Sequence, residues 1–143
     1  MKITQISVFL ENKEGRLHDA VKTLSDKGIN IRTLTIAESK DFGVLRIIVD
    51  RPEEAKEALV AHGFVARITE IVAVEVDDRP GGLARLLQVL QEHRINIEYM
   101  YAFTEKRADK GIMVFRFDDA DAAIAALKSH SIGVVGQKDV VNL

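Results

Sequence analysis

The sequence predicts an α+β protein built from two copies of a βαββαβ unit. Runs of β-branched and apolar residues alternate along the chain with segments whose apolar side chains recur at the spacing of a helix face. In addition, residues of the first half recur in the second half at a nearly constant distance, which indicates an internal repeat. Two small units account for the whole length of 143 residues.

The first unit is predicted to begin with a strand and a helix. Residues 3–10 are rich in β-branched and apolar side chains and form the expected strand. The apolar face of the helix that follows comprises Leu17, Ala20, Val21 and Leu24. These positions are i, i+3, i+4 and i+7, the pattern of an amphipathic helix. Gly28 is suited to end this helix.

The remainder of the unit is predicted to supply two strands, a helix and a last strand. A second strand is expected over residues 29–38 and a third over residues 44–49, with a turn between them. Pro52 then starts a second helix, because proline in a first turn loses no hydrogen bond. Gly63 ends that helix, and a strand over residues 65–69 completes the unit.

The repeat is supported by residues that match at fixed offsets. At 66 residues apart are Gly15 and Gly81, Leu17 and Leu83, Leu24 and Leu90, Ile29 and Ile95, and Asn30 and Asn96. At 68 residues apart are Gly43 and Gly111, Asp50 and Asp118, Ala55 and Ala123, Leu59 and Leu127, and His62 and His130. A two-residue insertion in the polar segment 104–110 explains the change. We therefore expect units at 1–69 and 70–143, with an almost unbroken strand over residues 64–76 at the boundary.

Composition limits the classes of function. The net charge of -2 gives no basic field, so we expect neither nucleic acid nor an anionic membrane as a partner. The absence of cysteine excludes disulfides, thiolate metal sites and cysteine nucleophiles. No metal, cofactor or catalytic constellation is expected from the remaining residues. The start of the chain lacks a signal-peptide pattern, and a cytoplasmic location is the default expectation.

The repeated turn between the first strand and the first helix is the clearest candidate for a binding site. It reads Glu11-Asn12-Lys13-Glu14-Gly15-Arg16-Leu17 in the first copy and Asp77-Asp78-Arg79-Pro80-Gly81-Gly82-Leu83 in the second. Glycine permits a close backbone approach there, and the start of a helix presents amide groups that have no partner within the helix. Such a turn suits a carboxylate or a phosphate.

A strand, Asp-Arg-Pro-Gly-Gly-Leu, a helix and then Ile-Asn-Ile at the next strand together resemble the ACT domain family, over the whole chain and in tandem. The resemblance implies two ferredoxin-like units side by side, with an eight-stranded antiparallel sheet and helices packed on one face. It also implies that an amino acid or similar effector binds at the interface between units. The implied ligand contacts in the first copy are Asn12, Glu14, Gly15, Arg16 and Asn30. Those in the second copy are Asp78, Pro80, Gly81, Gly82 and Asn96.

The two copies differ at the turn. The first copy has Glu14 where the second has Pro80, which places a carboxylate near the proposed anion site. The second turn, with Gly81 and Gly82, carries the least side-chain bulk and is favoured as the binding turn. Structural interpretations stay open, because Asp78 is also suited to cap the helix and the two Asn residues to satisfy backbone groups.

The leading hypothesis is a non-catalytic regulatory protein. An amino acid effector would bind it, and its homodimer would pass the change to an unidentified regulated enzyme. One alternative is a constitutive assembly module that binds no ligand. A second is a small acylphosphatase-like enzyme, which would need an arginine cradle in the first loop, for which Arg16 and Arg79 are the candidates.

Overall fold

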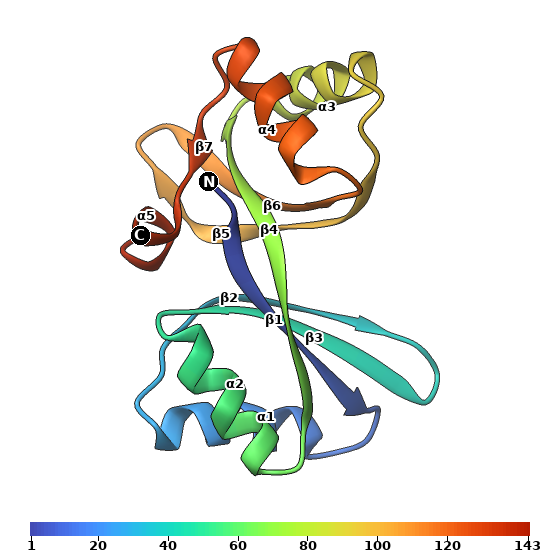
Figure 1. Ribbon diagram of the computed structural model, residues 1–143, viewed down its shortest axis with the longest axis vertical. Helices are drawn as coiled ribbons and strands as arrows, with labels where there is room; N and C mark the ends of the chain where they lie inside the picture. The colour runs from blue at the N-terminus through green and yellow to red at the C-terminus, as the bar shows by residue number, and fades with distance from the viewer. The chain divides into compact units, whose positions relative to one another are not determined.

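The computed structural model describes residues 1–143, which form two compact units (Figure 1). One unit comprises Thr4–Thr69, and the other comprises Glu70–Leu143 together with Met1–Ile3. Strand β4 (Val65–Asp77) runs through the boundary and so contributes to both units. Because β4 is shared, the structure has seven strands, where two separate units would have eight. The predicted α+β class with two βαββαβ units is confirmed.

The first unit follows the predicted order of elements. Its elements are β1 (Ile3–Glu11), α1 (Arg16–Asp26), β2 (Ile31–Glu38), β3 (Phe42–Val49), α2 (Pro52–Ala61) and the start of β4. Strands β1 and β2 both pair antiparallel with β3. Alternate residues of β1, Ile6, Val8 and Leu10, enter a core that also takes Leu24 from α1 and Leu59 from α2. Helices α1 and α2 therefore bury their apolar faces against one face of this sheet.

The second unit repeats this arrangement and adds a short helix. Its elements after β4 are α3 (Gly82–Glu92), β5 (Ile97–Arg107), β6 (Lys110–Phe117), α4 (Ala120–Ser129), β7 (Val134–Val135) and α5 (Gln137–Val141). The strand order is β5-β6-β4-β7, and each pair is antiparallel. Helix α5 was not predicted from the sequence, and it is only five residues long. No helix in the structure is long and apolar enough to cross a membrane.

Left-handed backbone conformations mark equivalent turns in both units. Gly15 and Gly81 are the N-caps of α1 and α3, with φ of 84° and 85°. Gly28 follows α1 with φ of 67°, and its equivalent after α3 is Arg94 with φ of 56°. The equivalent of Gly63 is Ser131, with φ of 57°. The second unit therefore keeps the same helix ends although the glycine signals have been lost.

Candidate functional site

The turn that joins β4 to α3 is a tight loop without a side-chain cap. The amide of Arg79 donates to the carbonyl of Asp77 at 3.0 Å, and the amide of Gly82 donates to the carbonyl of Arg79 at 3.0 Å. A Cβ atom on Gly82 would overlap the carbonyl oxygen of Asp77, so only glycine fits this close approach. No side chain caps α3, and the Gly82 amide is used within the turn, so a ligand here would bind the amides that follow Gly82.

Two pockets flank this turn and share Val76 and Asp77 as a common wall. The first, which we call the β5-side pocket, has a volume of about 430 Å³. Its lining comprises Val76, Asp77, Asp78, Arg79, Pro80, Leu83, Ala102, Phe103, Gly111, Ile112 and Met113. Most of its walls away from the turn are apolar.

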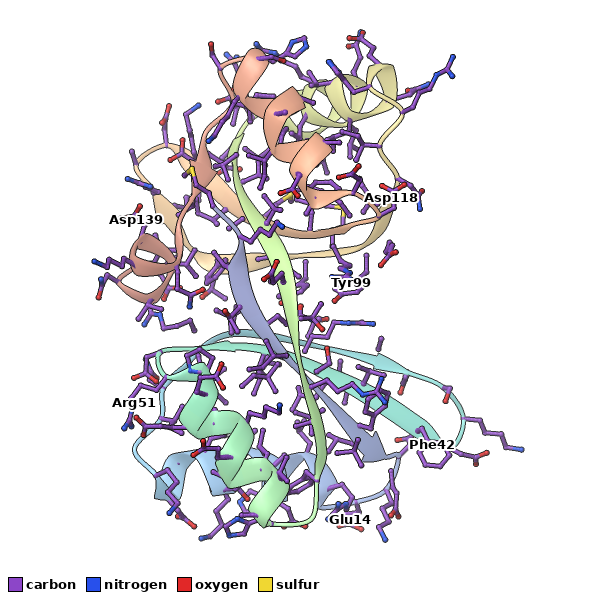
Figure 2. All side chains as sticks on the ribbon, in the orientation of Figure 1. Glu14, Phe42, Arg51, Tyr99, Asp118 and Asp139 are labelled. Atoms are coloured by element: carbon purple, nitrogen blue, oxygen red, sulfur yellow. The ribbon has the colours of Figure 1, made fainter.

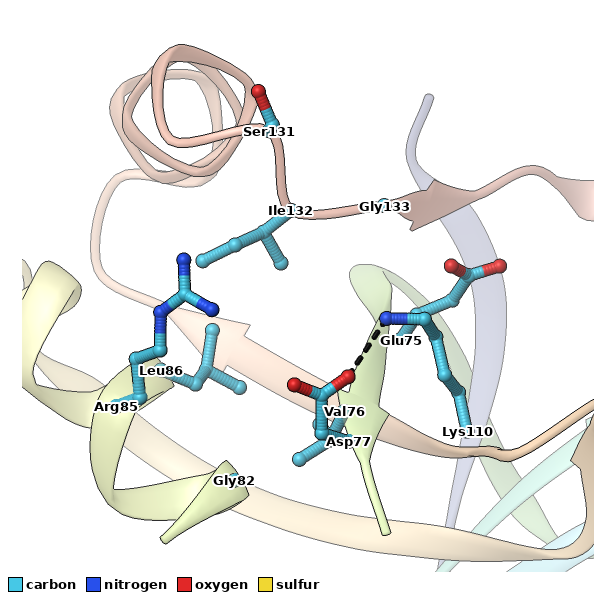
Figure 3. Close-up of a pocket in the computed structure, with 10 residues that line it drawn as sticks. All are labelled: Glu75, Val76, Asp77, Gly82, Arg85, Leu86, Lys110, Ser131, Ile132 and Gly133. Carbon is cyan, nitrogen blue, oxygen red and sulfur yellow. Dashed lines mark hydrogen bonds and ion pairs between the residues drawn. The ribbon is translucent and has the colours of Figure 1, made fainter. Parts of the chain in front are cut away.

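The second pocket, which we call the β7-side pocket, has a volume of about 250 Å³ and is more strongly charged. Its lining comprises Glu75, Val76, Asp77, Gly82, Arg85, Leu86, Lys110, Ser131, Ile132 and Gly133. Figure 3 shows Arg85 reaching from α3 on one side, with Asp77, Lys110 and Glu75 on the other. Two carboxylates and two cationic groups therefore face one small volume.

The ion pair between Asp77 and Lys110 stands in the wall of the β7-side pocket. The Lys110 Nζ atom donates to Asp77 Oδ1 at 2.7 Å, because β4 and β6 place the two residues opposite each other. The hydrogen bond from Lys110, and then the charge of Lys110, lower the pKa of Asp77 below its ordinary value. The same contacts raise the pKa of Lys110. Asp77 also accepts from Arg79 Nη2 at 3.3 Å.

This pair predicts a pH-dependent contribution to folding stability. A lowered Asp77 pKa stabilises the fold above the ordinary value of 3.8, and the effect is lost as the pH falls through the lowered folded value. The raised Lys110 pKa stabilises the fold below 10.5 and is lost at higher pH. Lys110→Met should therefore reduce the urea midpoint at about pH 7 and have a smaller effect at about pH 2.5. Lys128→Met, at an exposed lysine of α4, is the control; an equal loss at both pH values from Lys110→Met would contradict the assignment.

The predicted residues of the second copy lie in different places. Asp78 and Pro80 line the β5-side pocket, whereas Gly82 lines the β7-side pocket. The helix-cap interpretation of Asp78 is wrong, because Gly81 is the N-cap and the Asp78 carboxylate instead pairs with Lys106. Asn96 lies beyond the other end of α3, about 16 Å of helix away from the turn. One unit does not bring Asn96 and its own turn together.

The two predicted Asn residues form matching backbone contacts. The amides of Asn30 and Asn96 donate to Oδ1 of Asp50 and Asp118, at 3.0 Å and 3.1 Å. The carbonyl oxygens of the same Asn residues accept from the amides of the same Asp residues, both at 3.2 Å. The backbone of each Asn, rather than its side chain, thus closes the helix-to-strand turn, and both side chains are exposed.

The turn of the first unit is occupied by its own side chains. Asn12 Nδ2 donates to the carbonyl oxygens of Ser39 and Lys40, at 3.3 Å and 3.2 Å, and so fixes the β2–β3 turn. The Arg16 guanidinium lies over the Phe64 ring at 4.6 Å from its centroid and is 3.6 Å from Asp19 Oδ2. Glu14 is exposed beside the Gly15 cap (Figure 2). Arg16 therefore contacts its own unit and does not form an open cradle.

Sequence reasoning missed the charged residues of the β7-side pocket, namely Glu75, Arg85 and Lys110. They come from β4, α3 and β6, and only the folded unit brings them together. A comparison of the two repeats could have found them, because Glu75 replaces Phe9 and Lys110 replaces Phe42 at equivalent positions. Charged residues that replace apolar ones at the end of a sheet indicate that this end has a different role in the second unit.

Comparisons with protein families and with solved structures place the chain among known proteins. The model of a family described as an ACT domain pair matches residues 1–143. The crystal structure of protein BT0572 from Bacteroides thetaiotaomicron is 37% identical, with 100% of this chain and 98% of that chain covered and a TM-score of 0.93. No curated protein matches.

Two more distant structures share the fold. The ligand-free regulatory subunit of aspartate kinase from Thermus thermophilus is 22% identical, with 90% of each chain covered and a TM-score of 0.65. The corresponding subunit from Thermus flavus is 19% identical, with 88% of this chain and 90% of that chain covered and a TM-score of 0.59. Because the family model spans the whole chain, this protein belongs to the family of ACT domain pairs.

Proposed function

We propose that this chain is a non-catalytic regulatory protein whose second unit binds an amino acid effector at the turn between β4 and α3. The observation that carries the proposal is the uncapped start of α3 at Gly81 and Gly82, which stands between two pockets. Helix-start amides suit a carboxylate, and the acidic groups beside them suit an ammonium group. Both head groups of an amino acid therefore find complementary chemistry at this turn.

The family and the fold support a regulatory role. Two structures with this fold are regulatory subunits of aspartate kinase. By analogy, we propose that the chain forms a homodimer and that this homodimer contacts a regulated enzyme. Effector binding would change the affinity of the homodimer for the enzyme. Such coupling requires that the effector prefers one arrangement of the assembly over another.

The turn of the first unit is a weaker candidate for the effector. Asn12 holds the β2–β3 turn and Arg16 stacks on Phe64, so both side chains already have contacts within the unit. The acylphosphatase alternative gains no support from the geometry, because Arg16 is held in this way and Arg79 pairs with Asp77. The assembly module without a ligand remains the competing hypothesis.

The experiment compares a matched pair of glycine variants. Gly81→Ala and Gly15→Ala each place a methyl group at a residue with φ near 85° and open space around it. Each should cost about 1–2 kcal/mol of stability through the same backbone strain. Only Gly81→Ala changes the turn at which we propose that the effector binds, so it alone should weaken binding.

The measurement is a thermal shift of the protein against the twenty amino acids, with light scattering to determine the oligomer. An effector at about 100 times its Kd should stabilise the native protein by about 2.7 kcal/mol. The response should survive in Gly15→Ala and fall in Gly81→Ala. If no amino acid stabilises the wild-type protein, the assembly module is the better account.

A further inference from the structure

We propose that the β7-side pocket, rather than the β5-side pocket, holds the effector, and that it is built for an α-amino acid with a small aliphatic side chain. The inference rests on the proposed function and names the pocket and the ligand class. It draws on residues outside the predicted set, principally Arg85, Glu75 and Ile132.

The charges of this pocket are arranged for a zwitterion. Arg85 is exposed on α3, forms no ion pair in the structure and lines the pocket (Figure 3). Its guanidinium can hold a carboxylate with two parallel hydrogen bonds. Across the pocket, the Glu75 carboxylate lies 3.6 Å from the Arg107 guanidinium and also faces Lys110, and it can accept a hydrogen bond from an ammonium group. The two groups face the pocket from different elements, Arg85 from α3 and Glu75 from β4.

The rest of the lining defines the size and character of the ligand. Val76, Leu86 and Ile132 contribute apolar surface, which suits an aliphatic side chain. A volume of about 250 Å³ lies below the range of about 300–1,000 Å³ that is common for drug-sized ligands. Gly133 contributes to the space, since a Cβ atom there would lie 2.5 Å from Glu75 Oε2.

In the first unit, side chains occupy the position that corresponds to the β7-side pocket. By the offsets of the repeat, Gly82 corresponds to Arg16 and Ile132 to Phe64. The hydrogen bonds agree, because the amides of Phe64 and Ile132 donate to the equivalent carbonyl oxygens of Leu59 and Leu127. In the first unit Arg16 stacks on Phe64, a residue that is only 6% exposed. The second unit has a glycine and a smaller aliphatic residue there, which leaves the pocket open.

The acidic and basic positions also differ between the units. Phe9 takes the place of Glu75, Phe42 that of Lys110, and Asp19 that of Arg85. The first unit therefore has neither the guanidinium for a carboxylate nor the Glu carboxylate for an ammonium group. Its Asp19 instead lies 3.6 Å from the Arg16 guanidinium. The pocket chemistry is thus confined to the second unit.

A pair of arginine variants tests the choice of pocket. Arg85 and Arg79 are both exposed, and both lie near Asp77, but Arg85 lines the β7-side pocket and Arg79 the β5-side pocket. Arg85→Gln and Arg79→Gln make the same change, because each replaces a guanidinium with an uncharged amide. Calorimetry with valine and with leucine should show Arg85→Gln weakening binding by about tenfold or more, and Arg79→Gln by less than about threefold.

A second variant and two ligand analogues test the same pocket independently. Ile132→Phe introduces the residue of the first unit and should abolish binding by filling the space. Isovalerate lacks the ammonium group and isobutylamine lacks the carboxylate, so each should bind more weakly than valine. Isovalerate should also lose its dependence on Glu75, tested with Glu75→Gln.

The outcomes separate this inference from the proposed function. Amino acid binding that survives Arg85→Gln and Ile132→Phe but is lost in Arg79→Gln would overturn the pocket assignment and leave the regulatory role standing. Failure of every amino acid to bind the wild-type protein would overturn both. Circular dichroism of each variant, matched to wild type, confirms that a loss of binding does not reflect unfolding.

Discussion

Gly82→Ala is expected to lower the free energy of unfolding by about 2–3 kcal/mol, although alanine is the better helix former. The new Cβ atom would overlap the backbone carbonyl oxygen of Asp77, and backbone cannot move aside as a flexible side chain can. The overlap can be relieved only if the turn opens. The equivalent turn of the first unit, which carries Arg16 at this position, has the longer closing contact, with 3.4 Å from the Arg16 amide to the Lys13 carbonyl against 3.0 Å in the second unit.

The control is Gly136→Ala, because a Cβ atom there meets nothing within 4 Å and its φ of -83° suits any residue. Urea unfolding followed by circular dichroism should show a lower midpoint for Gly82→Ala and a midpoint close to wild type for Gly136→Ala. If both variants unfold at the same urea concentration as wild type, the turn is looser than the structure indicates, and Gly82 is not required by its close approach.

Sequence periodicity was sufficient for the fold because the longer helices and strands carry local signals. The apolar spacing in α1 and the repeat offsets predict two units without any knowledge of tertiary contacts. The sequence signal is lost where a residue other than glycine adopts a left-handed backbone conformation. Arg94 and Ser131 adopt left-handed conformations that Gly28 and Gly63 adopt in the first unit. Helix α5 has too few residues to show a period.

The candidate site was predictable only at its turn. Gly81 and Gly82 belong to one contiguous motif, and the backbone there is confirmed as the start of a helix. Arg85 lies on α3, Glu75 on β4 and Ile132 in the segment between α4 and β7. Their convergence depends on strand register and helix packing that no local pattern encodes. The same limit explains Asn96, which shares a motif with the turn but stands at the far end of α3. The roles of residues that meet only in the folded unit therefore cannot be predicted from local sequence patterns.

Phe115→Ala is expected to lower the free energy of unfolding by about 3–5 kcal/mol, the largest effect among these variants. Phe115 is 0% exposed on β6 and stacks on Phe117, with ring centroids 5.3 Å apart. Truncation removes buried apolar surface and leaves a cavity between the sheet and its helices, which the surrounding β-sheet cannot easily fill. The control is Phe42→Ala, which makes the same chemical change at a residue that is 59% exposed and whose side chain points away from the ribbon (Figure 2). Its effect on the free energy of unfolding should stay within about 0.5 kcal/mol. Urea unfolding of both variants decides the point, since equal losses would mean that burial at Phe115 does not determine the stability of the second unit.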